Sequence, residues 1–150
     1  MKTILITGIA GLLGSRLADW IIENTNNIVV GIDDLSGGYS EHINKEAIFY
    51  EFNLIDLGKI ESIFEKYNID TVYHFAAYAA EGLSPFIRKY NYENNLIAST
   101  NLITCSIQYE INRFVFASSM SVYGDKYTPP FNEEMRQEPI DPYAIAKYAV

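Results

Sequence analysis

The chain has 150 residues, of which 49% are hydrophobic and 20% are charged, a composition typical of one globular domain with a substantial core. Its formal net charge of −8 argues against a surface for nucleic acid or for an anionic membrane, because both gather Lys and Arg. Cys105 is the only cysteine, so no internal disulfide can form and the chain fits a reducing, cytoplasmic environment.

The first predicted elements are a strand and a helix joined by glycines. Residues 3–6 are apolar and mostly β-branched, and Thr7 leads from them into the pattern Gly8-x-x-Gly11-x-x-Gly14. We expect Gly8 to allow a tight turn, Gly11 to let a ligand approach the backbone, and Gly14 to let the helix pack on the strand. A helix that begins here presents free N–H groups and a partial positive charge to a pyrophosphate.

A second strand follows this helix. The helix is expected to bury one side, made of Leu13, Leu17, Trp20 and Ile21. The apolar residues 28–32 then end at Asp33, nineteen residues after Gly14, where a carboxylate would bind both hydroxyls of an adenosine ribose. An ordinary strand-turn-helix is the alternative for a lone glycine pattern, and these flanking elements disfavour it.

Strands and helices alternate through the rest of the chain. A loop is expected over 34–38, a strand over 47–52, and a helix over 55–67 that buries Leu57, Ile60, Ile63 and Phe64. A strand over 70–75, a helix over 86–109 and a strand over 113–117 complete the pattern. This order predicts an α/β fold with a doubly wound parallel sheet and helices on both faces. Ligands in such sheets lie at the carboxyl ends of the strands, here Gly8, Asp33, Asn53, Ala76 and Ser118.

The last segment combines a loop with the start of a helix. Residues 120–141 contain several prolines and are expected to be a loop, and Pro142 should open a helix capped by Asp141. The sequence stops at Val150, about two turns into that helix. We therefore interpret residues 1–150 as one dinucleotide-binding domain truncated within this helix, with a C-terminal substrate lobe absent from the chain.

Tyr143 and Lys147 share a face of this last helix, since they are four residues apart. A neighbouring ammonium favours the phenolate, so we expect the pKa of Tyr143 to be lowered toward that of a general base. A solvated helical pair is the usual alternative. The end of the fifth strand, Ser118-Ser119, favours the chemical interpretation, because a serine hydroxyl there could bind the same substrate oxygen.

Six motifs in order resemble the extended short-chain dehydrogenase/reductase family, in particular its NAD-dependent nucleotide-sugar epimerase and dehydratase branch. They are Thr7-Gly8-x-x-Gly11-x-x-Gly14, Asp33, His74-Phe75-Ala76-Ala77, Asn94-Asn95, Ser118-Ser119 followed by Val122-Tyr123-Gly124, and Tyr143-x-x-x-Lys147. The resemblance covers essentially the whole chain and implies a Rossmann-type NAD-binding domain. The segment 33–38 and the Ser-Ser-x-x-Val-Tyr-Gly motif are similar to UDP-hexose 4-epimerases.

The resemblance also implies a role for each matching residue. The amides of Leu12 and Leu13 would hold the NAD pyrophosphate, Asp33 the adenosine ribose, and Lys147 the nicotinamide ribose. Asn53 and Leu54 would flank the adenine, with Asn53 where the family often has Asp. The implied catalytic residues are Ser119, Tyr143 and Lys147, and the implied cofactor-binding residues are Gly8, Gly11, Leu12, Leu13, Gly14, Asp33, Asp34, Asn53, Leu54, Phe75, Ala76, Ala77, Asn94, Ser118, Tyr143 and Lys147.

The implied activity is epimerisation through a transient 4-keto sugar, with Tyr143 as the base at the sugar 4-hydroxyl and reversible hydride transfer to bound NAD. A 4,6-dehydratase, a decarboxylase or a dehydrogenase of the same family is the alternative. The dehydratases carry an Asp-Glu pair where this chain has Met120 and Ser121, which disfavours elimination. A non-catalytic NAD-binding sensor is a further alternative, and Ala79 departs from those epimerases that have a lysine there.

The expected partners are a nucleotide sugar, most simply a UDP-linked one, and a second copy of the chain. The resemblance implies a homodimer through a helix bundle that uses the helices at about 86–109 and from 142 onward. No nucleic-acid or membrane partner is expected because of the negative net charge. No metal is expected because no metal-ligand spacing occurs. His74, at a strand end, is expected to be a hydrogen-bonded structural residue.

Overall fold

The computed structural model describes residues 1–150 and contains a five-stranded parallel sheet in the order β3-β2-β1-β4-β5. The strands are β1 (Thr3–Thr7), β2 (Ile28–Asp33), β3 (Ile48–Glu51), β4 (Ile69–His74) and β5 (Arg113–Phe116). The helices are α1 (Leu12–Asn24), α2 (Leu57–Lys66), α3 (Arg88–Tyr92), α4 (Ala98–Gln108) and α5 (Pro142–Ala149). The predicted doubly wound α/β fold is confirmed.

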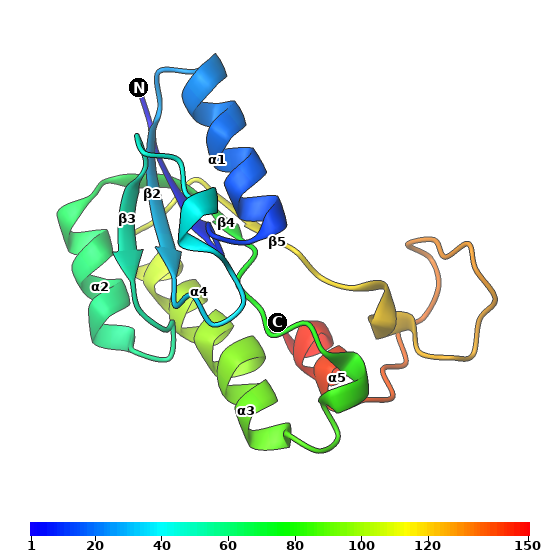
Figure 1. Ribbon diagram of the computed structural model, residues 1–150. Helices are drawn as coiled ribbons and strands as arrows, with labels where there is room; N and C mark the ends of the chain where they lie inside the picture. Colours follow the sequence, from blue (N-terminus) through cyan, green and yellow to red (C-terminus); the bar gives the residue numbers. More distant parts are fainter.

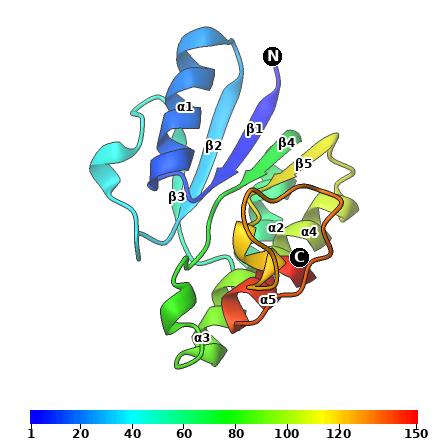
Figure 2. The same cartoon turned by 90° about the vertical axis from the view of Figure 1, so that its right-hand side faces the viewer.

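The sheet is buried on both faces, as its apolar strands require. Helix α1 covers one face, where Ile6, Ala18 and Val29 belong to the smaller of two core clusters. Helices α2 and α4 cover the other face, where Leu5 and Leu102 belong to the larger cluster. Figure 2 shows the sheet between these two layers of helix. The arrangement leaves the carboxyl ends of the strands open, and α3 and α5 lie beyond them (Figure 1).

The buried side of α1 differs from the predicted one. Leu13 and Trp20 are 61% and 58% exposed, whereas Gly14, Ala18 and Ile21 are buried. Small residues at the contact let the helix backbone approach the sheet, so the contact line runs along Gly14 and Ala18 and the larger side chains turn to solvent. The predicted stripe was wrong at Leu13 and Trp20 and right at Ile21.

The long helix predicted over 86–109 begins later and is not uniform. Phe86 is 84% exposed and precedes the helix. Between α3 and α4 the residues Glu93–Ile97, labelled η3, form a π-helix. Such segments occur frequently at functional sites. Three short 3₁₀ turns lie between the longer elements: η1 (Ser40–His42), η2 (Glu81–Leu83) and η4 (Met120–Tyr123), of which η4 falls within the loop predicted over 120–141. In α2, Leu57 is 37% exposed, which corrects its assignment to the buried stripe.

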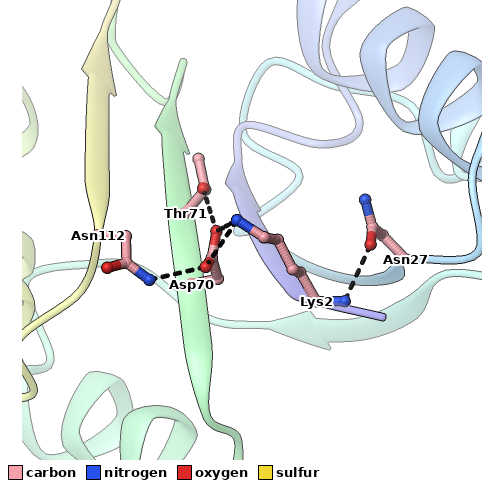
Figure 3. A network of polar contacts seen from close by, with 5 residues as sticks. All are labelled: Lys2, Asn27, Asp70, Thr71 and Asn112. Carbon is pink, nitrogen blue, oxygen red and sulfur yellow. Dashed lines mark hydrogen bonds and ion pairs between the residues drawn. The ribbon is translucent and has the colours of Figure 1, made fainter.

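Polar side chains connect the amino ends of four strands, β1, β2, β4 and β5 (Figure 3). Asp70, at the start of β4, accepts hydrogen bonds from Lys2 at 3.1 Å and from Asn112 at 2.8 Å. Lys2 precedes β1 and Asn112 precedes β5, and the backbone N–H of Lys2 donates to Asn27, which precedes β2. These contacts align the amino ends of the strands, opposite to the open side formed by their carboxyl ends.

The structure contains no helix with the length and apolar composition that a membrane span requires.

Candidate functional site

A cleft at the carboxyl ends of the strands contains about 720 Å³ of space free of protein atoms, part of which is open to solvent. Hydrogen bonds align these ends, since the N–H of Gly8 donates to Ile32 at 2.8 Å and the N–H of Phe75 donates to Thr7 at 3.1 Å. Ten of the cofactor-binding residues expected from the sequence line this cleft: Gly8, Gly11, Asp33, Asp34, Asn53, Leu54, Phe75, Ala76, Ala77 and Asn94.

The glycine turn brings the start of α1 to the rim of the cleft. Gly8 has a φ of +72°, a left-handed conformation that L side chains rarely adopt, and a Cβ there would lie 2.7 Å from the amide nitrogen of Ala76. A Cβ on Gly14 would overlap the carbonyl oxygen of Gly8. No side chain caps α1, so the amides of its first turn, including those of Leu12 and Leu13, have no intrahelical acceptor.

Asp33 turns its carboxylate toward the same rim. Its Oδ2 accepts the N–H of Ala10 at 3.0 Å and its Oδ1 accepts the N–H of Leu35 at 2.9 Å. These bonds fix the side chain and leave lone pairs on both oxygens for a ligand. A carboxylate beside free helix amides can bind a ribose diol next to a pyrophosphate.

A chain of polar side chains crosses the far end of the cleft. The Nδ2 of Asn53 donates to Asp34 at 2.7 Å and to Asn94 at 2.8 Å. The N–H and the hydroxyl of Ser36 both donate to Oδ1 of Asp34. Asn94 in turn donates to the carbonyl of Tyr90 at 2.9 Å. The loops that follow β2 and β3 are thereby joined to the π-helix.

Sequence reasoning did not assign several residues that line the cleft: Ile32, Ser36, Gly37, Gly38, Phe52, Tyr78, Tyr90 and Ala98. The pair Gly37-Gly38 and the position of Phe52 beside Asn53 were signals that could have identified three of them. The contact of Tyr78 with Tyr90, whose ring centroids lie 5.0 Å apart, depends on two segments that only the tertiary structure brings together.

The predicted catalytic residues form a second group at the same edge. Asp141 caps α5 by accepting the N–H of Ala144 at 2.9 Å, and Tyr143 and Lys147 on that helix are 6% and 5% exposed. Ser119 caps η4 and accepts hydrogen bonds from the N–H and the hydroxyl of Ser121. Burial therefore excludes the alternative of a solvated tyrosine–lysine pair.

Lys147 is held beside the end of β5. Its Nζ donates to the carbonyl of Ala117 at 2.9 Å and lies 4.7 Å from the ring centroid of Phe116. Burial lowers the pKa of Lys147 to about 8. The ammonium lies 5.8 Å from the ring centroid of Tyr143, so the two side chains share one small region of the protein.

The pKa of Tyr143 corrects the sequence-based expectation. Burial raises the pKa of its phenol, the nearby Ser119 hydroxyl opposes that rise, and the carboxylates of Glu81 and Asp141 add to it. The ammonium of Lys147 was expected to lower this pKa, but its hydrogen bond goes to Ala117. The phenol is therefore the favoured form of Tyr143 in this environment.

Buried amides connect α5 to the cleft. Asn91 donates to the carbonyl of Pro142 at 2.9 Å, and its own side-chain oxygen accepts from Asn95 at 2.8 Å. Asn95 also accepts the N–H of Tyr78 at 2.7 Å and donates to the carbonyl of Tyr78 at 3.0 Å. Helix α5, the π-helix and one wall of the cleft are thus a single hydrogen-bonded unit.

Besides Ser119, Tyr143 and Lys147, four predicted site residues lie outside the lining of the main cleft. Leu12 borders a neighbouring hollow beside α1. The side chains of Leu13 and Ser118 are exposed, and Gly14 is buried under the glycine turn. Leu12, Leu13 and Gly14 can therefore contact a ligand in the cleft only through their backbone groups. No group of three or more His, Cys, Asp or Glu residues is placed to hold a metal ion.

His74 is structural, as expected. Its Nδ1 lies 2.6 Å from the hydroxyl of Thr7 and its Nε2 lies 2.8 Å from that of Ser99. Because the Ser99 hydroxyl donates to the carbonyl of Asn95 at 2.7 Å, it accepts from His74, and Thr7 donates to the other ring nitrogen. Burial, with a smaller effect from the charge of Lys147, lowers the pKa of His74 to about 3.

This lowered pKa predicts a loss of stability in mild acid. Below pH about 6.5 the unfolded chain protonates His74, whereas the folded chain does not until about pH 3. Between pH 7 and 5.5 the free energy of unfolding should fall by about 1 kcal/mol through this residue alone. Urea unfolding at both pH values measures the fall. We expect His74→Gln to remove it and the matched change at exposed His42 to retain it; equal falls in both variants would contradict the assignment.

The family model, the related sequences and the similar solved structures found for this chain agree with one another. A family model described as the NAD dependent epimerase/dehydratase family matches residues 4–150. The chain is 33% identical to a UDP-glucose 4-epimerase of Schizosaccharomyces pombe, with 97% of this chain and 44% of that protein covered. Among solved structures it is similar to the UDP-glucose 4-epimerase of Thermotoga maritima with UDP-glucose (TM-score 0.93, 37% identity, 98% of this chain and 48% of that one). It is also similar to that of Brucella ovis in complex with NAD (TM-score 0.92, 29% identity, 99% and 45%). The chain thus spans less than half the length of each.

Proposed function

Because the chain belongs to the NAD dependent epimerase/dehydratase family, we propose that it is the NAD-binding part of a nucleotide-sugar epimerase that inverts C4 of a UDP-linked hexose. The observation that carries the proposal is the placement of two groups at one edge of the sheet. The cleft beside α1 suits a dinucleotide, and the buried Tyr143 and Lys147 lie beyond the ends of neighbouring strands. The relatives bearing the name UDP-glucose 4-epimerase support the sugar class.

The residues of the cleft fit NAD in a defined order. The free amides of Leu12 and Leu13 would bind the pyrophosphate, and Asp33 would bind the adenosine ribose. Ala76 and Ala77, which line the cleft, would border the bound cofactor, and Lys147 would bind the nicotinamide ribose. The negative charge of Asp33 disfavours the 2′-phosphate of NADP, which supports NAD as the cofactor.

The second group, which contains Ser119, Tyr143 and Lys147, would carry out acid–base catalysis at the sugar. Tyr143 would accept the proton of the 4-hydroxyl and return it after inversion, while Ser119 would hold the same oxygen by a hydrogen bond. Burial and the carboxylates of Glu81 and Asp141 raise the pKa of Tyr143, so the phenolate that this task needs would have to form in the presence of the bound sugar and NAD. Bound NAD would supply the hydride acceptor and donor.

Two further features support a homodimer and a cytoplasmic location. Apolar side chains are exposed on both α4 and α5, including Ile107 at 72% and Tyr148 at 57%, and a homodimer through a helix bundle would cover side chains of this kind. A substrate-binding lobe outside residues 1–150 would complete the sugar site. The single cysteine, Cys105, is buried and its pKa is raised to about 11, which fits a cytoplasmic protein.

The decisive experiment supplies the protein, joined to whatever further chain its gene encodes, with UDP-glucose and UDP-galactose separately. We expect each sugar to be converted into the other without added NAD, as followed by chromatography of the nucleotide sugars. Release of water or of CO₂ would favour a dehydratase or a decarboxylase instead. Binding of NAD without turnover of any nucleotide sugar would favour a sensor.

A further inference from the structure

The 3₁₀ turn η2, which carries Glu81, lies beside α5, the helix that carries Tyr143 (Figure 1). Ser84, which is fully buried, joins the turn to that helix. Its hydroxyl donates to the carbonyl of Glu81 at 2.8 Å and lies 3.2 Å from Oδ1 of Asp141, the residue that caps α5. Glu81 therefore has a defined position next to the predicted catalytic residues.

The chain that leads into η2 is also held in place. The side chain of Asn95 accepts the N–H of Tyr78 at 2.7 Å and donates to the carbonyl of Tyr78 at 3.0 Å. The N–H of Ser84 donates to the carbonyl of Ala80 at 3.0 Å and so closes the turn. Because Tyr78 also lines the cleft, the segment that carries Glu81 connects the wall of the cleft to the start of α5.

Two carboxylates act on the phenol of Tyr143, and they differ in what they bind. Asp141 is committed to the start of α5, where it accepts the N–H of Ala144 at 2.9 Å. Glu81 is exposed, its hydrogen bonds use only its backbone, and its carboxylate forms no ion pair. Its charge still raises the pKa of Tyr143. A sugar whose 4-oxygen meets this phenol therefore also lies in the field of the Glu81 carboxylate.

An ionised carboxylate accepts hydrogen bonds and repels other anions. On a hexose, the reacting carbon C4 is flanked by C3, which bears a hydroxyl, and by C5, which bears a hydroxymethyl group. Either hydroxyl is a donor that suits a carboxylate. In a hexuronic acid the group on C5 is itself a carboxylate, and its negative charge would oppose that of Glu81.

We propose that Glu81 is a specificity-determining residue of the sugar site, where its carboxylate accepts a hydrogen bond from a hydroxyl next to C4 and selects a neutral UDP-hexose over a UDP-hexuronic acid. This inference rests on the proposed epimerase function and narrows its substrate class. Glu81 takes no proton in the reaction, and Tyr143 remains the base.

The test compares UDP-galactose with UDP-galacturonic acid as substrates of the protein joined to whatever further chain its gene encodes. We expect kcat/KM for inversion of the neutral sugar to exceed that for the uronic acid by at least about 30-fold, because two like charges at close range oppose binding. Glu81→Gln keeps the size of the side chain and an acceptor oxygen. It should reduce this ratio at least about tenfold, mainly by lowering KM for the uronic acid.

A second measurement shows whether Glu81 acts on the base. Removing its charge removes one cause of the raised pKa of Tyr143, so kcat/KM for UDP-galactose should begin to rise at a lower pH in Glu81→Gln. The other charged groups near the phenol, Asp141 and Lys147 on α5, are unchanged by this substitution. Glu65→Gln, which removes one exposed charge on α2, should alter neither the ratio nor the pH profile.

Glu81→Ser removes the same charge with a smaller side chain and should lower the ratio to a similar extent, which provides a second variant if Glu81→Gln does not fold. Equal kcat/KM for the two sugars in the unaltered protein, or a preference for the uronic acid, would overturn the inference while leaving the epimerase function intact. A ratio or a pH profile that survives the loss of the charge would also overturn it. Failure to invert either sugar would instead overturn the proposed function.

Discussion

Replacing Tyr143 with phenylalanine should reduce kcat for sugar inversion by about 1,000-fold, while KM and the affinity for NAD change little. The change removes one hydroxyl from a side chain that is 6% exposed, so the packing of α5 is retained and only the proton acceptor is lost. General acid–base groups typically contribute factors of about 100 to 10,000. Steady-state rates with UDP-galactose, together with a titration of NAD, measure both quantities.

The control lies on the same helix. Tyr148 is 57% exposed, and Tyr148→Phe makes the identical chemical change outside the buried group. We expect it to retain full activity. If Tyr143→Phe turned over the sugar at a rate close to that of the unaltered protein, another residue would have to be the base and the proposed mechanism would fail.

Replacing Gly14 with alanine should lower the free energy of unfolding by about 2 kcal/mol or more. A methyl group at this position would overlap the carbonyl oxygen of Gly8 and press on the Cα of Ile9 at 2.8 Å, and backbone atoms cannot turn aside as a flexible side chain can. The shift of α1 needed to relieve the overlap would also displace the amides of Leu12 and Leu13. We therefore expect weaker NAD binding together with a melting temperature lower by about 5 °C.

Gly58 in α2 provides the matched control. Its nearest neighbour to an added methyl group is Oδ1 of Asp56 at 3.7 Å, which is an ordinary contact. Because alanine favours helix by about 1 kcal/mol over glycine, Gly58→Ala should be neutral or stabilising. Thermal unfolding of both variants makes the comparison. Equal stability of Gly14→Ala and Gly58→Ala would show that the close approach of α1 to the glycine turn is unimportant.

The sequence alone predicted the structure correctly wherever the determinants of that structure lie within one short segment. Residues 3–14 carry their strand, their turn and their helix start within one short segment, because β-branching and glycine act through the backbone of the residue itself. Asp141 and Pro142 likewise mark the start of α5 by capping chemistry alone. Since the carboxyl ends of parallel strands meet at one edge, ten of the residues predicted to bind the cofactor line one cleft.

Long-range packing decided the rest. Leu13 and Trp20 are exposed because of how closely α1 approaches the sheet. The spacing of apolar residues along a helix gives no information about this distance. The pKa of Tyr143 was predicted with the wrong direction. Desolvation depends on tertiary packing, and the hydrogen bond of Lys147 to Ala117 joins residues 30 positions apart in the chain.

The chain of hydrogen bonds from Asp34 through Asn53 to Asn94 also belongs to the tertiary structure. These residues lie 19 and 41 positions apart, and no local pattern marks them as partners. Residue types and spacing by themselves determined the fold class, the glycine turn and the candidate catalytic residues, since each depends on backbone conformation near one point of the chain. Only the tertiary structure decided which polar atoms remain free to bind a ligand. Most buried side-chain donors and acceptors form hydrogen bonds with residues that folding brings close, and only the remaining groups are available to a ligand.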